Sequence, residues 1–187
     1  KKYLPHLIAI VAFAIITFIS FKPLFNGKDI DQSDIRQHRG MSKELVDYRN
    51  SEHSEALWTN SMFGGMPGYQ VSTLYPGNWI SQVDQFMHLY FPHPSGYIFM
   101  CFLGFFILLL CLEMSPWLAF VGALAYGFSS YFFIILEVGH NSKANAISYL
   151  APVLGGLILL MRGKYWLGFA VTTLFMALEL NANHVQI

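Results

Sequence analysis

The sequence predicts an all-α membrane protein with about five transmembrane helices and one long loop outside the membrane. Of its 187 residues, 55% are hydrophobic and only 12% are charged, whereas roughly 25% of the residues in an average soluble domain are charged. Five apolar runs approach the length of about 20 residues that crosses a bilayer. The net charge is zero, so no basic surplus indicates a nucleic-acid partner, and the apolar excess indicates membrane lipid instead.

The five runs follow one another with recognisable boundaries. Ser115 and Pro116 have the residue types of an N-cap and a first helical position, which opens the third run. Pro152 and the pair Gly155 and Gly156 predict a kink in the fourth run. No small-residue cleavage site follows the first run, which argues against a signal peptide. The predicted spans cover residues 4–25, 95–112, 117–136, 144–161 and 165–180.

Basic residues orient the predicted spans. Lys1 and Lys2 precede the first span, and Arg162 and Lys164 lie in the turn between the fourth and the fifth. Four spans separate these two places, so both lie on one side of the membrane, and their charge predicts that this side is cytoplasmic. Residues 26–94 and 137–143 and the C-terminal end are then outside.

The predicted outer loop, residues 26–94, is too long to be a plain connection. Its first part contains three acids, Asp29, Asp31 and Asp34. The stretch MSKELVDYRN predicts a short helix after an N-cap at Ser42. Apolar residues at helical spacing over residues 79–90 predict an amphipathic helix that lies in the membrane interface.

Polar residues gather at the outer ends of three predicted spans. They are Glu137, His140, Asn141, Lys143, Glu179, Asn183 and His184. An ordinary turn in which Lys143 snorkels is the simpler reading of the first four, as a solvated linker is for the three acids of the loop. Glu179 is harder to explain in this way, because an acid near the end of a span is rare unless it faces protein or water.

These residue types suit one kind of chemistry. A carboxylate can accept a proton from an attacking hydroxyl group, while Lys, Arg and His can hold a phosphate leaving group. No spacing matches a zinc site, although Asp and His residues could recruit Mg²⁺ or Mn²⁺. The sequence shows no P-loop, no dinucleotide-binding glycine pattern and no serine elbow.

Several stretches resemble a known family over nearly the whole chain. QSDIRQHRGMSKEL, LWTNSMFGGMPGYQ, LYPGN, GHNSKANA and NANHVQI are similar to the N-terminal part of YfhO-like bacterial membrane proteins, which belong to the GT-C glycosyltransferases. The resemblance implies transfer of a sugar from a polyprenyl-phosphate carrier to a cell-envelope glycan or lipid at the outer face of the plasma membrane. Members are several hundred residues long, so we expect this chain to be a single-domain membrane fragment of a longer protein whose further helices would complete the site.

The resemblance also suggests roles for residues. GT-C enzymes typically place a catalytic acid early in the first outer loop, and the matching position is Asp34, with Asp31 and Asp29 as nearby alternatives. Charge and depth suggest Arg36, His140, Asn141, Lys143, Asn183 and His184 as phosphate-binding residues, with Glu137 and Glu179 in support.

Two other functions stay open at the level of the sequence. A transporter or flippase of lipid-linked sugars would use the same polar groups as a passage, with Glu179 as a proton-coupling acid. Such sites lie near the bilayer midplane, whereas these groups cluster at one surface, which favours the enzyme. A non-catalytic envelope assembly protein would tolerate neutralisation of Asp34.

Overall fold

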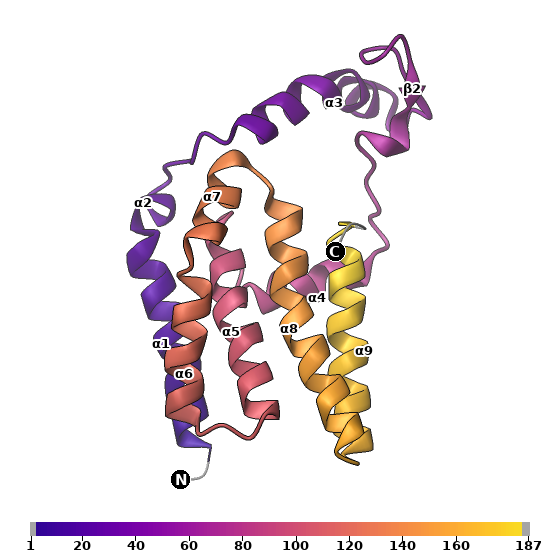
Figure 1. The fold of residues 1–187 in the computed structure, drawn as a ribbon. Coiled ribbons are helices and arrows are strands. Elements are labelled where there is room, and N and C mark those ends of the chain that lie inside the picture. Colours follow the sequence, from indigo (N-terminus) through magenta and orange to yellow (C-terminus); the bar gives the residue numbers. More distant parts are fainter. Residues whose placement is uncertain (1–2, 185–187) are drawn as a thin grey trace. The chain divides into compact units, whose positions relative to one another are not determined.

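The computed structural model describes residues 3–184, which fold into α-helices apart from one 3₁₀ turn and a pair of two-residue strands (Figure 1). The predicted all-α class is therefore confirmed. The chain divides into two compact units, a helical unit formed by Lys1–Ile30 and Ile80–Ile187 and a loop unit formed by Asp31–Trp79. Lys1 and Lys2, which oriented the first predicted span, and residues 185–187 of the NANHVQI motif lie outside the described residues.

The helical unit is built around α5. Helices α1, α6 and α8 pack against α5, and α9 packs against α8 (Figure 1). The helices of this unit are α1 Leu4–Ser20, α2 Lys22–Phe25, α4 Trp79–Met87, α5 Ser95–Cys111, α6 Pro116–Gly127, α7 Ser130–Val138, α8 Asn141–Met161 and α9 Tyr165–Asn181. The first residue of α4, Trp79, is the last residue of the loop unit.

Helix boundaries agree in part with the predicted runs. The Ser115 hydroxyl accepts a hydrogen bond from the backbone N–H of Leu118 at 3.4 Å, so the predicted N-cap of α6 is confirmed. The first run is broken between α1 and α2, and the third between α6 and α7, whose axes bend by 43°. By contrast, α8 continues as one helix through Pro152.

Within the described residues, α8 is long and apolar enough to cross a membrane, and the bent pair α6 and α7 passes the same test when taken together. Helices α1 and α5 are apolar but have 17 residues each, or about 26 Å at 1.5 Å per residue, somewhat less than a hydrocarbon core of about 30 Å. The prediction of five spans therefore stays a prediction.

Aromatic rings and close backbone approach hold the helical unit together. The ring of Phe13 in α1 stacks on Phe102 of α5 and on Phe120 of α6, with centroids 5.5 and 5.0 Å apart. A Cβ atom at Gly104 of α5 would collide with the backbone carbonyl oxygen of Ser148 in α8. This glycine therefore sets how closely α5 and α8 approach.

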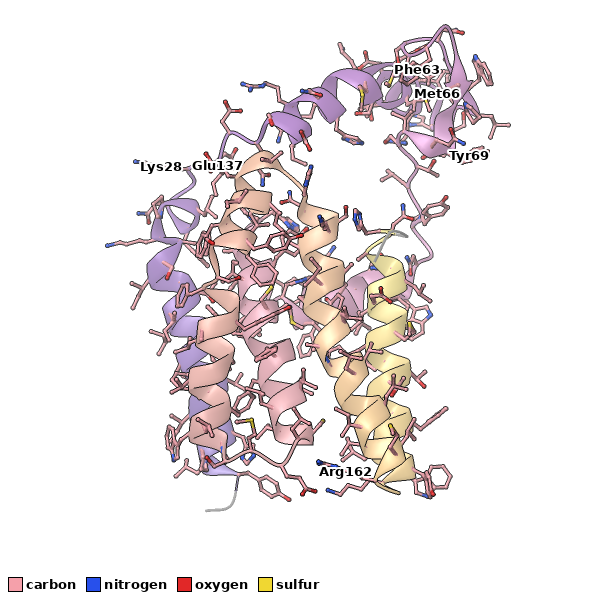
Figure 2. All side chains as sticks on the ribbon, in the orientation of Figure 1. Lys28, Phe63, Met66, Tyr69, Glu137 and Arg162 are labelled. Carbon is pink, nitrogen blue, oxygen red and sulfur yellow. The ribbon has the colours of Figure 1, made fainter. Side chains whose placement is uncertain are left out.

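The loop unit consists of α3 Ser33–Glu52, strands β1 Trp58–Thr59 and β2 Met66–Pro67, and the 3₁₀ turn η1 Gly68–Gln70. One oxygen of the Glu44 carboxylate accepts hydrogen bonds from the Thr59 hydroxyl at 2.6 Å and from the backbone N–H of Asn60 and of Ser61, each at 3.0 Å. These bonds tie the strand pair to α3. Phe63 and Met66 lie at the strand pair, and Tyr69 lies in η1 directly after it (Figure 2).

The prediction that a short helix begins after Ser42 was wrong about where the helix begins. Helix α3 begins at Ser33, and Ser42 is a buried residue inside it. The polar stretch before Ser42 is itself helical, and Gly40 does not interrupt it because one glycine costs a helix only about 1 kcal/mol.

Packing at Gly104 yields a stability prediction. Gly104→Ala should lower the free energy of unfolding by about 1 to 3 kcal/mol, because the added methyl group forces α5 and α8 apart. Gly40→Ala on α3, where a Cβ meets no atom within 4 Å, should instead raise it by up to about 1 kcal/mol. Denaturant titration of the chain in detergent micelles, followed by helical circular dichroism, measures both. Equal effects of the two substitutions would contradict the close contact.

Candidate functional site

The sequence-predicted polar residues of the helical unit lie at one end of it, which we call the His140 end. Helices α7 and α9 finish at this end, and α5 and α8 begin there (Figure 1). Glu137 marks the His140 end, whereas Arg162 lies at the opposite end of the unit (Figure 2). At that opposite end Lys164 and Arg162 contact the Glu113 carboxylate at 3.1 and 3.6 Å.

Gly139 makes the corner between α7 and α8. Its φ of 111° is a left-handed conformation, which glycine adopts at little cost. The backbone N–H groups of Gly139 and His140 both donate to the carbonyl of Ile135, at 3.2 and 2.9 Å, and α8 starts at Asn141. The turn thereby places His140, Asn141 and Lys143 within one turn of the start of α8.

Lys143 is held by an aromatic ring. Its ammonium nitrogen lies 5.6 Å from the ring centroid of Tyr131 in α7, which is within the range of a cation–π interaction. Lys143 and Asn141 are half-buried, while Glu137 and His140 are exposed. The cation is therefore positioned at the corner by the neighbouring helix.

The residues predicted at the end of α9 lie at the same end of the unit. Glu179 is half-buried in the last turn of α9, Asn183 is exposed with a φ of 53°, and His184 is half-buried. All seven residues predicted from the helix ends thus come from one end of the helical unit.

The predicted acids of the loop lie near the start of the loop unit. Arg36 donates to Asp31 at 2.9 Å, with both side chains mostly exposed, and an exposed ion pair of this kind contributes little to stability. Asp34 lies in the first turn of α3, where the Ser33 hydroxyl donates to it at 3.5 Å. Asp29 is exposed in the segment before the loop unit.

The sequence interpretation missed a buried carboxylate in α4. One oxygen of Asp84 accepts hydrogen bonds from the Tyr149 hydroxyl at 2.7 Å and from the Asn145 side-chain amide at 3.1 Å, both in α8. Its other oxygen lies 3.4 Å from Nδ1 of His88, the residue that follows α4. The Asp84 side chain is 16% exposed and that of His88 is 7% exposed.

His88 has one nitrogen in this cluster and one without a partner. An imidazole that donates through Nδ1 to a carboxylate carries its lone pair on Nε2 when it is neutral. Within the described part of the chain, Nε2 of His88 is buried and makes no hydrogen bond. The ring lies edge-on to Tyr97 with centroids 5.2 Å apart. A buried polar atom without a hydrogen-bond partner lowers the stability of the fold by about 1 to 3 kcal/mol.

The Asp84 cluster forms part of the wall of a cavity of about 330 Å³ at the same end of the unit. Ser81 donates to the side-chain oxygen of Asn181 at 3.2 Å, which fastens α4 to the end of α9 beside the cavity. We call this space the Asp84 cavity. It is lined by Ser81, Asp84, Gln85, His88, Tyr90, Phe91, His93, Gly96, Tyr97 and Asn181.

Electrostatics fix the charge of the cavity wall. Burial raises the pKa of Asp84, but the hydrogen bond and charge of His88, together with the donors on Tyr149 and Asn145, outweigh burial and lower it. Burial lowers the pKa of His93, and the nearby His88 charge lowers it further, against an opposing effect of Asp84. Asp84 is therefore ionised and His93 neutral at neutral pH.

In residues 3–184, no group of three or more His, Cys, Asp or Glu side chains is arranged to hold a metal ion. Comparisons with models of protein families, with curated proteins and with solved structures found no match to this chain. The roles of its residues therefore rest on their own geometry and chemistry.

A signal for the Asp84 cluster was present in the sequence. Asp84 and His88 are four residues apart in an amphipathic helix, and Asn145 and Tyr149 are four residues apart in an apolar one. Each pair lies on one face of its helix. Polar pairs in two helices are complementary in type, but the sequence does not reveal that the two faces meet.

The hydrogen bond from Tyr149 predicts a pKa change. Tyr149→Phe removes the shortest bond to Asp84 while burial remains, so the pKa of Asp84 should rise. The wild-type carboxylate, with its lowered pKa, stabilises the fold above pH about 4 and loses this effect as the pH falls through that pKa. As the pH falls, the variant should lose the stabilisation from the ionised carboxylate at a higher pH than the wild type does.

Carbon-13 NMR of labelled aspartate side chains measures this titration. Tyr126→Phe is the matched control, because the Tyr126 ring stacks on Phe105 and Tyr126 is not among the groups that lower the pKa of Asp84. An Asp84 titration that is unchanged by Tyr149→Phe would show that the hydroxyl does not hold the carboxylate.

Proposed function

We propose that this chain is an integral membrane protein whose helical unit contacts lipid. Large apolar side chains are exposed along several of its helices, including Leu7 of α1 at 60%, Val121 of α6 at 60% and Phe169 of α9 at 63%. Extended apolar surfaces of this kind are unusual in water and mark contacts with membranes or partners. Lipid is the partner that fits helices with apolar residues on both their inner and their outer faces.

Its proposed function is transfer of a sugar from a polyprenyl-phosphate carrier to a cell-envelope glycan or lipid at the outer face of the bacterial plasma membrane. The observation that carries this proposal is that the polar ends of three apolar helices and the Asp84 cavity lie at the same end of the helical unit. A substrate with a lipid tail, a phosphate and a sugar would need such a boundary between apolar and polar surface.

The corner between α7 and α8 supplies groups that suit the carrier phosphate. His140 precedes α8 and Lys143 lies in its first turn, where the helix dipole favours negative charge. Charge-assisted hydrogen bonds from such groups stabilise a phosphate leaving group. Arg36, Asn183 and His184 remain candidates for the same role.

In this proposal an acceptor hydroxyl oxygen attacks the anomeric carbon of the sugar, and the bond from that carbon to the phosphate oxygen breaks. The hydroxyl proton passes to a carboxylate, and the polyprenyl phosphate leaves as an anion. The resemblance to GT-C enzymes favours Asp34 as this carboxylate, with Asp31 as the alternative. Arg36 already contacts one carboxylate oxygen of Asp31 at 2.9 Å, which leaves that oxygen less available to an acceptor hydroxyl.

A second candidate function is proton-coupled transport of a lipid-linked sugar. One observation favours it: Asp84, His88 and Tyr149 form a buried chain of exchangeable protons between α4 and α8, and buried ionisable groups in membrane proteins often couple proton movement to transport. Movement of a labelled lipid-linked sugar across vesicle membranes, without transfer to an acceptor, would identify this function.

Asp34→Asn tests the proposed enzyme. Removing a general base typically lowers the rate about 10²- to 10⁴-fold, so sugar transfer from a polyprenyl-phosphate donor should fall by that factor in membranes of cells that express the protein. Asp47→Asn is the control, because it removes an exposed carboxylate of the same helix that pairs with Lys43, and it should leave transfer unchanged. Equal transfer by the two variants would exclude Asp34 as the base.

The proposed orientation is tested by cysteine labelling. Cysteines that replace Ser54 and Asn141 should react with a membrane-impermeant thiol reagent added outside, whereas one that replaces Gly163 should react only after the membrane is opened. The two native cysteines, Cys101 and Cys111, are buried, so they should contribute little background. If only Gly163→Cys is labelled in sealed cells, the true orientation is the opposite of the one proposed.

A further inference from the structure

We propose that the Asp84 cavity binds one uncharged sugar ring, with the carrier phosphate outside it. This inference rests on the proposed function and names the part of the substrate that each polar region would take. It is carried by the size of the cavity, by the charge of its wall and by the unpaired nitrogen of His88.

The volume of the cavity limits its ligand. About 330 Å³ lies at the lower end of the range of small-molecule sites, which is about 300 to 1,000 Å³. A space of this size accommodates a single ring rather than a polyprenyl chain or an oligosaccharide.

The charge of the wall excludes an anion. Asp84 is an ionised carboxylate of the lining at neutral pH, and no Lys or Arg contributes to the lining. A phosphate would be repelled by this carboxylate, whereas a neutral ligand that donates hydrogen bonds would be attracted. Lys143, a cation of this end of the unit, lies outside the lining, at the corner between α7 and α8.

Hydroxyl groups would satisfy the polar atoms of the wall. Nε2 of His88 is buried and has no hydrogen-bond partner in the described structure, and a ligand hydroxyl, which can donate to a ring nitrogen or accept from it, would remove that cost. Ser81 and Gln85 add polar groups, while Phe91 and Tyr97 add ring surfaces. This mixture of polar groups and apolar faces matches a sugar ring, which has hydroxyl groups at its edge and C–H groups on its faces.

Gly96 keeps the imidazole in place. A Cβ atom at Gly96 would lie 2.9 Å from the Cβ of His88, closer than such atoms approach. The start of α5 therefore needs glycine for His88 to occupy the cavity wall beside Asp84.

Binding of free monosaccharides tests this inference directly. The chain is purified in a phosphocholine detergent, because alkyl glycoside detergents carry the proposed ligand. Saturation-transfer NMR then measures the Kd of glucose, galactose, mannose and N-acetylglucosamine, with inorganic phosphate as the anionic comparison. At least one sugar should bind, and phosphate should not compete with it.

Three variants of α4 locate the binding. Asp84→Asn should weaken sugar binding about ten- to a hundredfold, as expected for loss of a hydrogen bond to a charged group. Gln85→Ala should weaken it about three- to tenfold. Both Gln82 and Gln85 are exposed, but Gln82 is not part of the cavity wall, so Gln82→Ala should change the Kd less than twofold and is the matched control.

The outcomes separate this inference from the proposed function. Sugar binding that is weakened by Asp84→Asn and by Gln85→Ala supports the inference even if no sugar transfer is found. Absence of sugar binding, equal binding by Gln85→Ala and Gln82→Ala, or displacement of the sugar by phosphate overturns it. If the binding experiment gives one of these negative results but the protein still transfers sugar, the proposed function stands and the Asp84 cavity is not its sugar-binding site.

Discussion

The Asp84 carboxylate is the interaction on which the His140 end of the helical unit depends. A buried charge is costly unless it is paired and hydrogen-bonded, and Asp84 obtains its partners from His88, which follows α4, and from Asn145 and Tyr149 of α8. Helix α4 has 9 residues, too few to be stable alone. Its position therefore depends on these contacts, on the bond from Ser81 to Asn181 and on its apolar face.

This constraint also explains why a cavity exists there. Side chains that satisfy a buried carboxylate are held in fixed directions and cannot rearrange to fill neighbouring space. His88, fixed by Asp84 on one nitrogen, keeps the other nitrogen without a partner. The protein thus retains an unsatisfied buried nitrogen in a residue that lines the cavity, which costs stability and calls for a partner.

The sequence predicted the helices far better than the site. Apolar runs and the Ser115 and Pro116 start signal are local features, so the helical class and the cap of α6 followed from them. The breaks within the first and third runs were not predicted, although Lys22 and Pro23 follow the first break and Ser129 lies at the other. The Asp84 cluster depends on contacts over 61 and 65 residues, and pattern alone does not pair such distant faces. The corner at Gly139, by contrast, was evident from its polar residues.

The two polar regions of the His140 end differ in charge, and this difference bears on the chemistry. The cavity wall contains an anion, whereas the corner between α7 and α8 presents a cation held over the ring of Tyr131. A lipid-linked sugar phosphate has the complementary division into a neutral, hydroxyl-rich ring and an anionic group joined by one bond. If each part is held in its own region, that bond lies at their boundary, where positive charge stabilises the departing phosphate and the carboxylate does not oppose it. A site that placed Asp84 beside the phosphate would instead resist the charge that develops as the bond breaks.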